Sequence, residues 1–311
     1  MKTGHNDPDT GVAHDKTQNF VALPTTHTTA DRDRASLPRQ ARLPINRCSL
    51  PAVLLGSLAY QKRPVALALD GVLELHKPLF MALDRLADPA ERARLFQNHM
   101  AAAFSLDSPE EAGWRDNARH ARAKAHYLRL LRGWAFDSDG QEGAVLKGWV
   151  ESCFGLLPRH HGGPIRDFSA LPYRAYLEQR SRGLYGTNAL EAQLDLLYTY
   201  CQYELGRQRL GQTHITLYRG VNHMGDHETL YEMAHPADNL RDKPRRVVLL
   251  NSLSSFTRNR ERAGEFGDFI LEVEVPLAKV AFFHGLLPGR LAGEDEYAVI
   301  GGVYEVEYAT T

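Results

Sequence analysis

Two glutamates close to the C-terminus, Glu294 and Glu296, have the spacing of side chains that act together. In an extended backbone successive side chains alternate, so both glutamates point to one face and Asp295 points to the other. Two carboxylates on one face repel each other, which costs stability and suits acid–base chemistry or the stabilisation of a developing cation. An ordinary acidic turn before a strand has the same composition, and the triplet alone favours that interpretation.

A second candidate is Arg219, which ends the strand-like stretch 214–219 (HITLYR). Ile215, Leu217 and Arg219 share one face, and an arginine in an apolar row is costly unless an anion meets it. The planar guanidinium fork suits a phosphate. Read alone, the pattern fits at least as well an arginine whose charged end reaches solvent at the end of a strand.

Hydroxyl side chains cluster at residues 251–257 (NSLSSFT), directly after the apolar, strand-like stretch 247–250. Hydroxyls at a strand end can orient a carboxylate or hold a ribose. A serine-rich turn that caps a helix over 260–266 is the alternative, and it is favoured when this cluster is taken by itself.

The three clusters follow one another along the β-rich part of the chain. Arg219 precedes Ser255 by 36 residues, and Ser255 precedes Glu296 by 41 residues. Each cluster is a weak signal, but three of them at strand ends in the same region form a much stronger one. Their order therefore favours one shared site over three unrelated turns.

The elements that must position these residues fall into two regions. Residues 45–209 are mainly helical in pattern, with helices predicted over 50–58, 70–86, 143–154 and 188–205. A further long helix is expected to start at 108–111 and to continue through Trp134, before a break at 136–140. Residues 210–311 carry strands, predicted over 214–219, 247–250, 269–275, 279–284, 297–300 and 303–308. Pro78 kinks or divides the second helix, and Gly301-Gly302 is expected as a turn or bulge. Segregated helices and strands predict an α+β fold, with residues 45–311 as one compact unit.

Composition excludes several classes of protein. The chain has 311 residues and a formal net charge of −1, which argues against a nucleic-acid-binding surface. No apolar run approaches the roughly 18 residues of a membrane span, and the N-terminus lacks the apolar core of a signal peptide. Cys48, Cys153 and Cys201 are widely spaced, so we expect reduced thiols in a cytoplasmic protein and no zinc site. Residues 1–44, with an apolar patch at 20–23, predict a disordered tail.

The order of Arg219, Ser255, Glu294 and Glu296 resembles the motif of the arginine-modifying mono-ADP-ribosyltransferases. The serine motif of that class is matched best by 255–257 (SFT), with Ala263, Phe266 and Gly267 downstream. Phe256 replaces a small middle residue and Thr257 replaces the last serine. Ser252 and Ser254 therefore stay open as alternatives for the working hydroxyl.

Longer stretches outside this motif resemble the dinitrogenase reductase ADP-ribosyltransferases of nitrogen-fixing bacteria. They are 46–48 (NRC), 54–59 (LLGSLA), 131–134 (LRGW), 136–140 (FDSDG) and 157–163 (LPRHHGG). The resemblance covers about residues 45–311. It implies a β-rich ADP-ribosyltransferase core of two small packed sheets over 210–311. The helical region over 45–209 would help to cover NAD and present a docking surface for proteins.

The resemblance implies transfer of ADP-ribose from NAD to an arginine of dinitrogenase reductase, the nitrogenase iron protein, which switches nitrogen fixation off. Glu296 would stabilise the cation that forms on the sugar, and Glu294 would hold the acceptor guanidinium and take its proton. Arg219 would clamp the pyrophosphate, and Ser255 would orient Glu296 and touch the nicotinamide ribose. The expected NAD-binding set adds their neighbours Tyr218, Gly220 and Thr257.

The same resemblance implies NAD as a substrate, no metal, and a PII signalling protein as a regulatory partner. Several alternatives stay open at this point. They are an arginine ADP-ribosyltransferase with another protein target, an NAD glycohydrolase, and a non-catalytic NAD-binding or partner-binding regulator. A glycosidase is disfavoured, because Glu294 and Glu296 are too close in sequence to flank a sugar from opposite sides.

Overall fold

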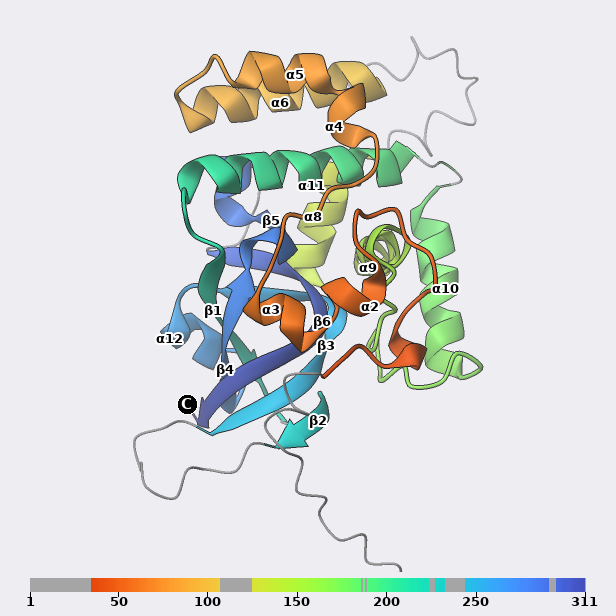
Figure 1. The fold of residues 1–311 in the computed structure, drawn as a ribbon. Coiled ribbons are helices and arrows are strands. Elements are labelled where there is room, and N and C mark those ends of the chain that lie inside the picture. Colours follow the sequence, from red (N-terminus) through yellow and green to blue (C-terminus); the bar gives the residue numbers. More distant parts are fainter. Residues whose placement is uncertain are drawn as a thin grey trace, which may run out of the picture.

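The computed structural model describes residues 35–106, 125–185, 187, 189–223, 227–232, 244–290 and 295–310. The elements of the first part are η1 (Arg39–Ala41), α2 (Ala52–Leu55), α3 (Leu58–Lys62), α4 (Val72–Leu75), α5 (Lys77–Leu83), α6 (Pro89–Phe104), α8 (Tyr127–Phe136), α9 (Gln141–Phe154), α10 (Leu171–Gly183) and α11 (Ala189–Gln208). Those of the second part are β1 (His214–Val221), β2 (Glu228–Glu232), β3 (Arg245–Thr257), α12 (Arg260–Gly264), β4 (Phe269–Pro276), η3 (Leu277–Lys279), β5 (Val280–Phe283), η4 (His284–Leu286) and β6 (Glu296–Thr310). The chain is thus an α+β protein (Figure 1).

The strands of the described chain form one antiparallel sheet of six, in the order β2-β3-β1-β4-β6-β5. β3 and β6 also pair with each other, from Arg245 opposite Glu307 to Thr257 opposite Glu296. β1 pairs with β4 along its whole length and meets β3 only at Tyr218 opposite Thr257. These pairings close a ring of β1, β4, β6 and β3, so the expected two small packed sheets are not confirmed.

β6 is a single strand where the sequence predicts two strands separated by a turn or a bulge at Gly301-Gly302; the turn is wrong, and the ladder with β3 does shift its register at this place. Gly301 and Gly302 continue the strand. A Cβ atom at Gly301 would lie 1.9 Å from the carbonyl oxygen of Asn251, where β3 carries an irregularity between Leu250 and Leu253. These glycines therefore allow two backbones to approach closely, rather than reversing the chain.

β3 extends well beyond the predicted stretch 247–250. It continues to Thr257, so the hydroxyl cluster lies inside a strand and not in a turn. The helix that follows is capped instead by Asn259, whose Oδ1 accepts a hydrogen bond of 2.9 Å from the backbone N–H of Glu261. The helix-capping alternative for the serines is therefore wrong. β2 has no counterpart among the predicted strands.

The predicted helix over 70–86 is two helices, α4 and α5. Pro78 lies in the first turn of α5, where its missing N–H leaves no hydrogen bond unmade. α6 follows Asp88, whose side chain accepts a hydrogen bond of 3.0 Å from the N–H of Ala90. Neither α6 nor α10 is among the predicted helices. The start of the predicted helix at 108–111 lies outside the described residues, and the part that contains Trp134 is found as α8.

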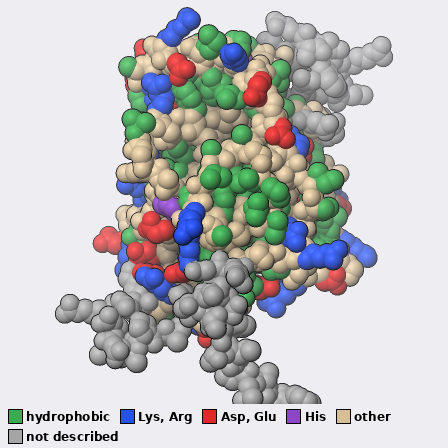
Figure 2. All heavy atoms as spheres, in the orientation of Figure 1, with side chains coloured by type: hydrophobic (Ala, Val, Ile, Leu, Met, Phe, Trp, Pro, Cys, Tyr) green, Lys and Arg blue, Asp and Glu red, His purple; other side chains and the backbone are tan. Residues whose placement is uncertain are grey.

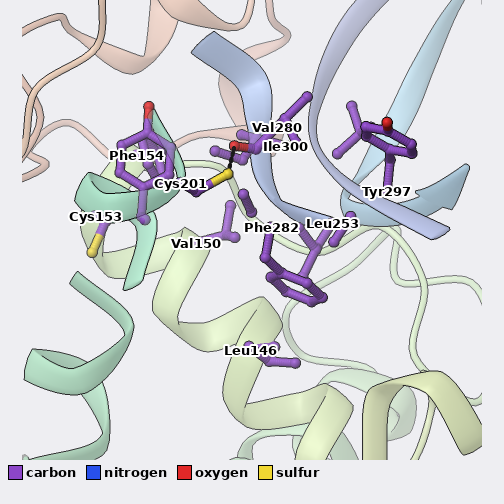
Figure 3. Packing of buried hydrophobic residues seen from close by; sticks show 14 of the residues in the cluster. Leu146, Val150, Cys153, Phe154, Cys201, Leu253, Val280, Phe282, Tyr297 and Ile300 are labelled. Carbon is purple, nitrogen blue, oxygen red and sulfur yellow. Dashed lines mark hydrogen bonds between the residues drawn. The ribbon is translucent and has the colours of Figure 1, made fainter. Parts of the chain in front are cut away.

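α11 lies between the sheet and the outer helices. Figure 1 shows α5 and α6 side by side beyond α11, on the side away from β5. The thiol of Cys201 in α11 lies 3.6 Å from the carbonyl oxygen of Val280 in β5. In Figure 3, Val150 of α9 lies close to this contact, on the side of α9 that faces Leu253 of β3. One cluster of buried hydrophobic residues therefore runs through helices and sheet.

Residues 35–44 fall within the predicted tail, yet several of them belong to this core. Ala35, Leu37 and Ala41 are buried in the shared cluster. The carbonyl of Ala35 also accepts a hydrogen bond of 3.0 Å from the N–H of Leu58 at the start of α3. The apolar patch at 20–23 lies outside the described residues.

Charged side chains of both signs lie on the face drawn in Figure 2. None of the described helices is both long and apolar enough to cross a membrane. Cys48, Cys153 and Cys201 are all buried free thiols.

Candidate active site

Ser255 and Glu296 lie on one face of the ladder formed by β3 and β6. Ser255 is opposite Ala298 and Thr257 is opposite Glu296, so Ser255 and Glu296 are diagonal neighbours on the same face. The hydroxyl of Ser255 donates a hydrogen bond of 2.7 Å to Oε1 of Glu296. Strand pairing thus brings together two residues that are 41 positions apart.

The two alternative serines lie in the same strand but do not reach the carboxylate. Ser252 is 1% exposed, and its hydroxyl has no hydrogen-bond partner in the described part of the chain. Ser254 is also buried and is opposite Val299 of β6. Ser255 is therefore the hydroxyl that the fold presents to Glu296.

A further donor to Glu296 comes from the helical region. The indole Nε1–H of Trp134, near the end of α8, donates a hydrogen bond of 3.0 Å to the same Oε1 that Ser255 contacts. Trp134 is buried, with only 2% of its surface exposed. This contact with Glu296 is not predicted from the sequence, because the helical pattern marks Trp134 only as an apolar position.

Arg219 reaches the site from β1. The single pairing of Tyr218 with Thr257 brings β1 beside the end of β3, and Nη1 of Arg219 donates a hydrogen bond of 2.7 Å to the carbonyl oxygen of Ser255. Burial lowers the pKa of Arg219, and the negative charge of Asp139 opposes this effect. The buried Nε of Arg219 has no hydrogen-bond partner among the described residues. Its guanidinium thus keeps a donor unused.

These residues line a cleft made of two hollows. The carboxylate hollow, which contains Glu296, Tyr218 and Thr257, has a volume of about 380 Å³. The basic hollow, which contains Arg159, Arg166, Lys147 and His160, has a volume of about 390 Å³. The residues that line both hollows are Trp134, Ser138, Arg219, Gly220, Ser255 and Phe266.

The other predicted site residues support the cleft in different ways. A Cβ atom at Gly220 would lie 2.0 Å from the carbonyl oxygen of Ala263, so this glycine lets α12 pack closely on β1. The hydroxyl of Thr257 accepts a hydrogen bond of 3.1 Å from the N–H of Asn259, which ties the end of β3 to the start of α12. Tyr218 lines the carboxylate hollow.

Glu294, the first acid of the predicted pair, lies outside the described residues. Its neighbour Asp295 has a φ of 57°, in the left-handed region that is uncommon for residues other than glycine. The chain therefore turns sharply just before β6. The predicted common face of Glu294 and Glu296 stays a prediction.

The segments 137–140 and 159–164 meet at the wall of the basic hollow. Lys147 of α9, only 1% exposed, donates hydrogen bonds to Oδ1 of Asp139 at 2.7 Å and to the carbonyl of His160 at 3.0 Å. Burial acts to raise the pKa of Asp139, but the hydrogen bonds and charges of His160 and Lys147 outweigh it and hold that pKa well below its usual range. Burial lowers the pKa of Lys147, and Asp139 opposes this effect.

The amide of Asn251 extends this connection to the sheet. Its Oδ1 accepts a hydrogen bond of 2.8 Å from the N–H of Arg159, and its Nδ2 donates one of 2.9 Å to the carbonyl of His160. Arg159 in turn forms an ion pair of 2.8 Å with Glu228 of β2. Loop 159–164 is therefore fixed against β3 and β2 as well as against α9.

A sequence profile described as dinitrogenase reductase ADP-ribosyltransferase matches residues 45–308. The chain belongs to this family. Within the curated proteins it is 40% identical to the NAD(+)--dinitrogen-reductase ADP-D-ribosyltransferase of Rhodospirillum rubrum, over 266 residues that cover 84% of this chain and 93% of the relative. No solved structure matches the chain.

The region matched by the dinitrogenase reductase ADP-ribosyltransferase family contains both walls of the cleft. It includes Trp134 on α8 and Lys147 on α9, as well as Arg219, Ser255 and Glu296 on the sheet. Across the described ranges, no group of three or more His, Cys, Asp or Glu side chains is arranged to hold a metal ion. Glu296 and Arg219 both line the carboxylate hollow, and each forms a hydrogen bond with Ser255.

Proposed function

We propose that this protein transfers ADP-ribose from NAD to an arginine of dinitrogenase reductase and thereby regulates nitrogen fixation. The observation that carries the proposal is the position of Glu296 in the cleft. Its carboxylate is oriented by Ser255 at 2.7 Å, and Ser255 is in turn tied to Arg219 at 2.7 Å. The family and the curated relative support the choice of reaction and target.

NAD fits the two hollows as an elongated substrate. The nicotinamide riboside would occupy the carboxylate hollow, next to Glu296, and the adenosine would occupy the basic hollow. The pyrophosphate would then lie at the residues shared by both hollows, which include Arg219. An arginine fork is suited to hold phosphate oxygens by two hydrogen bonds.

The chemistry follows from the charge that develops when NAD is cleaved. Breaking the bond between nicotinamide and ribose leaves the pair of bonding electrons on nicotinamide and positive charge on the sugar. The carboxylate of Glu296 stabilises this cation and accepts a hydrogen bond from the ribose 2′-hydroxyl. An arginine nitrogen of the acceptor then forms the new bond to the sugar, which inverts the anomeric centre.

The acceptor must lose a proton for this bond to form. An arginine guanidinium is protonated in water and is a poor nucleophile. Glu294 would hold the guanidinium and take its proton, so the products are ADP-ribosyl-arginine, nicotinamide and one proton. Replacing Glu294 by Gln is expected to keep NAD hydrolysis and to remove transfer to arginine.

The wider setting of the reaction belongs to the same proposal. Residues 45–311 would act as one unit, which the hydrophobic cluster shared by helices and sheet supports. The enzyme would act in the cytoplasm, use NAD without a metal, and bind a PII signalling protein as its regulator. An arginine ADP-ribosyltransferase with another target is the second candidate, because the cleft alone does not select the acceptor protein.

The test is incubation of the purified protein with labelled NAD and purified dinitrogenase reductase, in parallel with Glu296→Gln. We expect label on an arginine of the target with the wild type, and neither labelling nor NAD hydrolysis with the variant. Near-normal turnover by Glu296→Gln would refute the assigned role of this carboxylate. If the wild type consumes no NAD with or without PII protein, the result would favour a non-catalytic regulator that binds NAD or a partner protein.

A further inference from the structure

The carboxylate of Glu296 is held from two regions of the fold at once. Ser255 of β3 and Trp134 of α8 both donate to Oε1, at 2.7 and 3.0 Å. A carboxylate oxygen has two lone pairs in its plane, so these donors use the hydrogen-bonding capacity of Oε1. Oε2 has no hydrogen-bond partner in the part of the chain that the structure describes, and it remains available to a substrate.

We propose that Trp134 is a positioning residue of the transfer reaction. Its indole N–H, together with Ser255, fixes the rotation of the Glu296 carboxylate and keeps Oε2 free for the ribose. Because an indole N–H can only donate, it offers no competing acceptor to the sugar hydroxyl. The inference rests on the proposed function, since it takes Glu296 as the group that acts on the ribose.

The helical region holds Trp134 firmly enough for this task. The start of α8 is tied to α11 by Gln193, whose Oε1 accepts a hydrogen bond of 2.9 Å from the N–H of Tyr127 and whose Nε2 donates one of 3.0 Å to the carbonyl of Ala125. One residue before Trp134, a Cβ atom at Gly133 would lie 2.5 Å from the side chain of Glu142, so α8 packs tightly on α9. The indole therefore has a defined position relative to the sheet.

The competing explanation is that Trp134 only fills space between α8 and the sheet. Trp149 of α9 provides a comparison within the same molecule. It is equally buried at 2% exposure, and its Nε1–H donates a hydrogen bond of 2.8 Å to Oδ1 of Asp195. Asp195 lies in the helical core and lines neither hollow of the cleft. Removing either indole N–H thus deprives a carboxylate of one donor, but only one of these carboxylates faces substrate.

The test compares full-length Trp134→Phe and Trp149→Phe in NAD hydrolysis and in transfer to dinitrogenase reductase. Loss of a hydrogen bond to a charged group corresponds to about 10-fold to 100-fold in rate when it acts on the transition state. We expect kcat of Trp134→Phe to fall by about that factor in both reactions, with KM for NAD within about threefold. Trp149→Phe should lower the thermal midpoint and leave kcat within about twofold.

A double variant separates positioning from packing. Trp134→Phe and Ser255→Ala remove the two donors to the same oxygen, so their combined loss of kcat should be smaller than the product of the single losses. Independent packing defects would multiply. Incorporation of benzothienylalanine at position 134 gives a second test that does not depend on a change of shape. It replaces the indole N–H by sulfur in a ring of nearly the same size, and it should reproduce the kcat loss of Trp134→Phe.

Two outcomes would overturn the inference. If benzothienylalanine at position 134 leaves kcat unchanged, the hydrogen bond to Glu296 has no role in the reaction. If KM for NAD rises while kcat is kept, Trp134 contacts NAD and does not position Glu296. Either result would leave the proposed function intact, because wild-type labelling of the target tests that function separately.

Discussion

The helical region and the sheet treat buried charge differently. In the helices, Arg92 of α6 and Glu204 of α11 are 3% and 2% exposed and are joined by two hydrogen bonds of 2.6 and 2.8 Å. Asp195 of α11 accepts from Arg47 at 2.6 Å as well as from Trp149. Each of these buried charges has the opposite charge beside it, which offsets the cost of removing it from water.

The β-rich part of the chain instead contains two cations, Arg219 of β1 and Lys279 of η3, without a carboxylate at ion-pair distance, as far as the described residues extend. Lys279 is fully buried and donates a hydrogen bond of 2.7 Å to the carbonyl of Gly301, with the ring of Tyr304 4.7 Å away. Burial lowers its pKa to about 7. Arg219 also lacks an acidic partner, but it borders the cleft.

A cation without an acidic partner therefore has a different role in each of these two places. Arg219 faces an open cleft and cannot readily lose its proton, so it is suited to an incoming anion. Lys279 faces a closed core that no anion can enter, so it is stabilised by a carbonyl and an aromatic ring and releases its proton near neutral pH. Three predictions test this distinction.

The largest effect is expected at the buried pair in the helices. Glu204→Gln leaves Arg92 charged and without its carboxylate, and should lower the free energy of unfolding by about 3–5 kcal/mol. Urea unfolding followed by circular dichroism measures the change. The matched control is Glu178→Gln, which removes the carboxylate of an exposed pair with Arg182 and should cost no more than about 0.5 kcal/mol.

A second variant shows whether the loss comes from the unpaired charge. Glu204→Gln combined with Arg92→Met removes both charges and should recover a large part of the stability. If the double variant is less stable than Glu204→Gln, the pair is not the reason for the loss, and the first half of the comparison fails.

The next effect is expected at Arg219 and concerns activity more than stability. Arg219→Met removes a cation that has no carboxylate partner, so the free energy of unfolding should change by no more than about 1 kcal/mol. The kcat/KM for NAD should fall at least about 100-fold, because the pyrophosphate loses its arginine. Arg219→Lys keeps the charge and should give an intermediate value. Unchanged kcat/KM in Arg219→Met would show that NAD does not use this cation.

The smallest effect is a pH dependence at Lys279. Between its folded pKa of about 7 and its ordinary value of 10.5, the unfolded chain binds a proton that the folded protein has released. The free energy of unfolding therefore rises with pH in this interval, by about 1.4 kcal/mol per pH unit at most. Measured against Lys279→Met from pH 7.5 to 9, the wild type should gain stability. The stability of exposed Lys77→Met should rise with pH in parallel with that of the wild type. If the stability difference between the wild type and Lys279→Met does not change with pH, the lowered pKa of Lys279 is contradicted.

Much of the candidate site could be predicted from sequence because its residues follow strand rules. The position of Ser255 on β3 and of Glu296 on β6 fixes their common face once the two strands pair. The order of Arg219, Ser255 and Glu296 therefore contained most of the information about the cleft. The α+β class followed equally from the separation of helical and strand patterns.

The remaining features depend on contacts between distant parts of the chain. Gly301-Gly302 has the local pattern of a turn or a bulge, and only the approach of Asn251 and Gly56 explains why it continues a strand. Trp134 contacts Glu296 across 162 positions, and no local pattern distinguishes it from Trp149. The packing of Ala35 and Leu37 is similarly invisible, because short, mostly polar segments become ordered only when a core accepts their few apolar side chains.

The contact between Trp134 and Glu296 also has an optical consequence. An indole is the main source of intrinsic protein fluorescence, and its emission depends on the charges and water around it. The chain contains three tryptophans, and Trp134 lines both hollows of the cleft. The protein thus carries its own fluorophore at the site, so the entry of a nucleotide should change its emission without any added label.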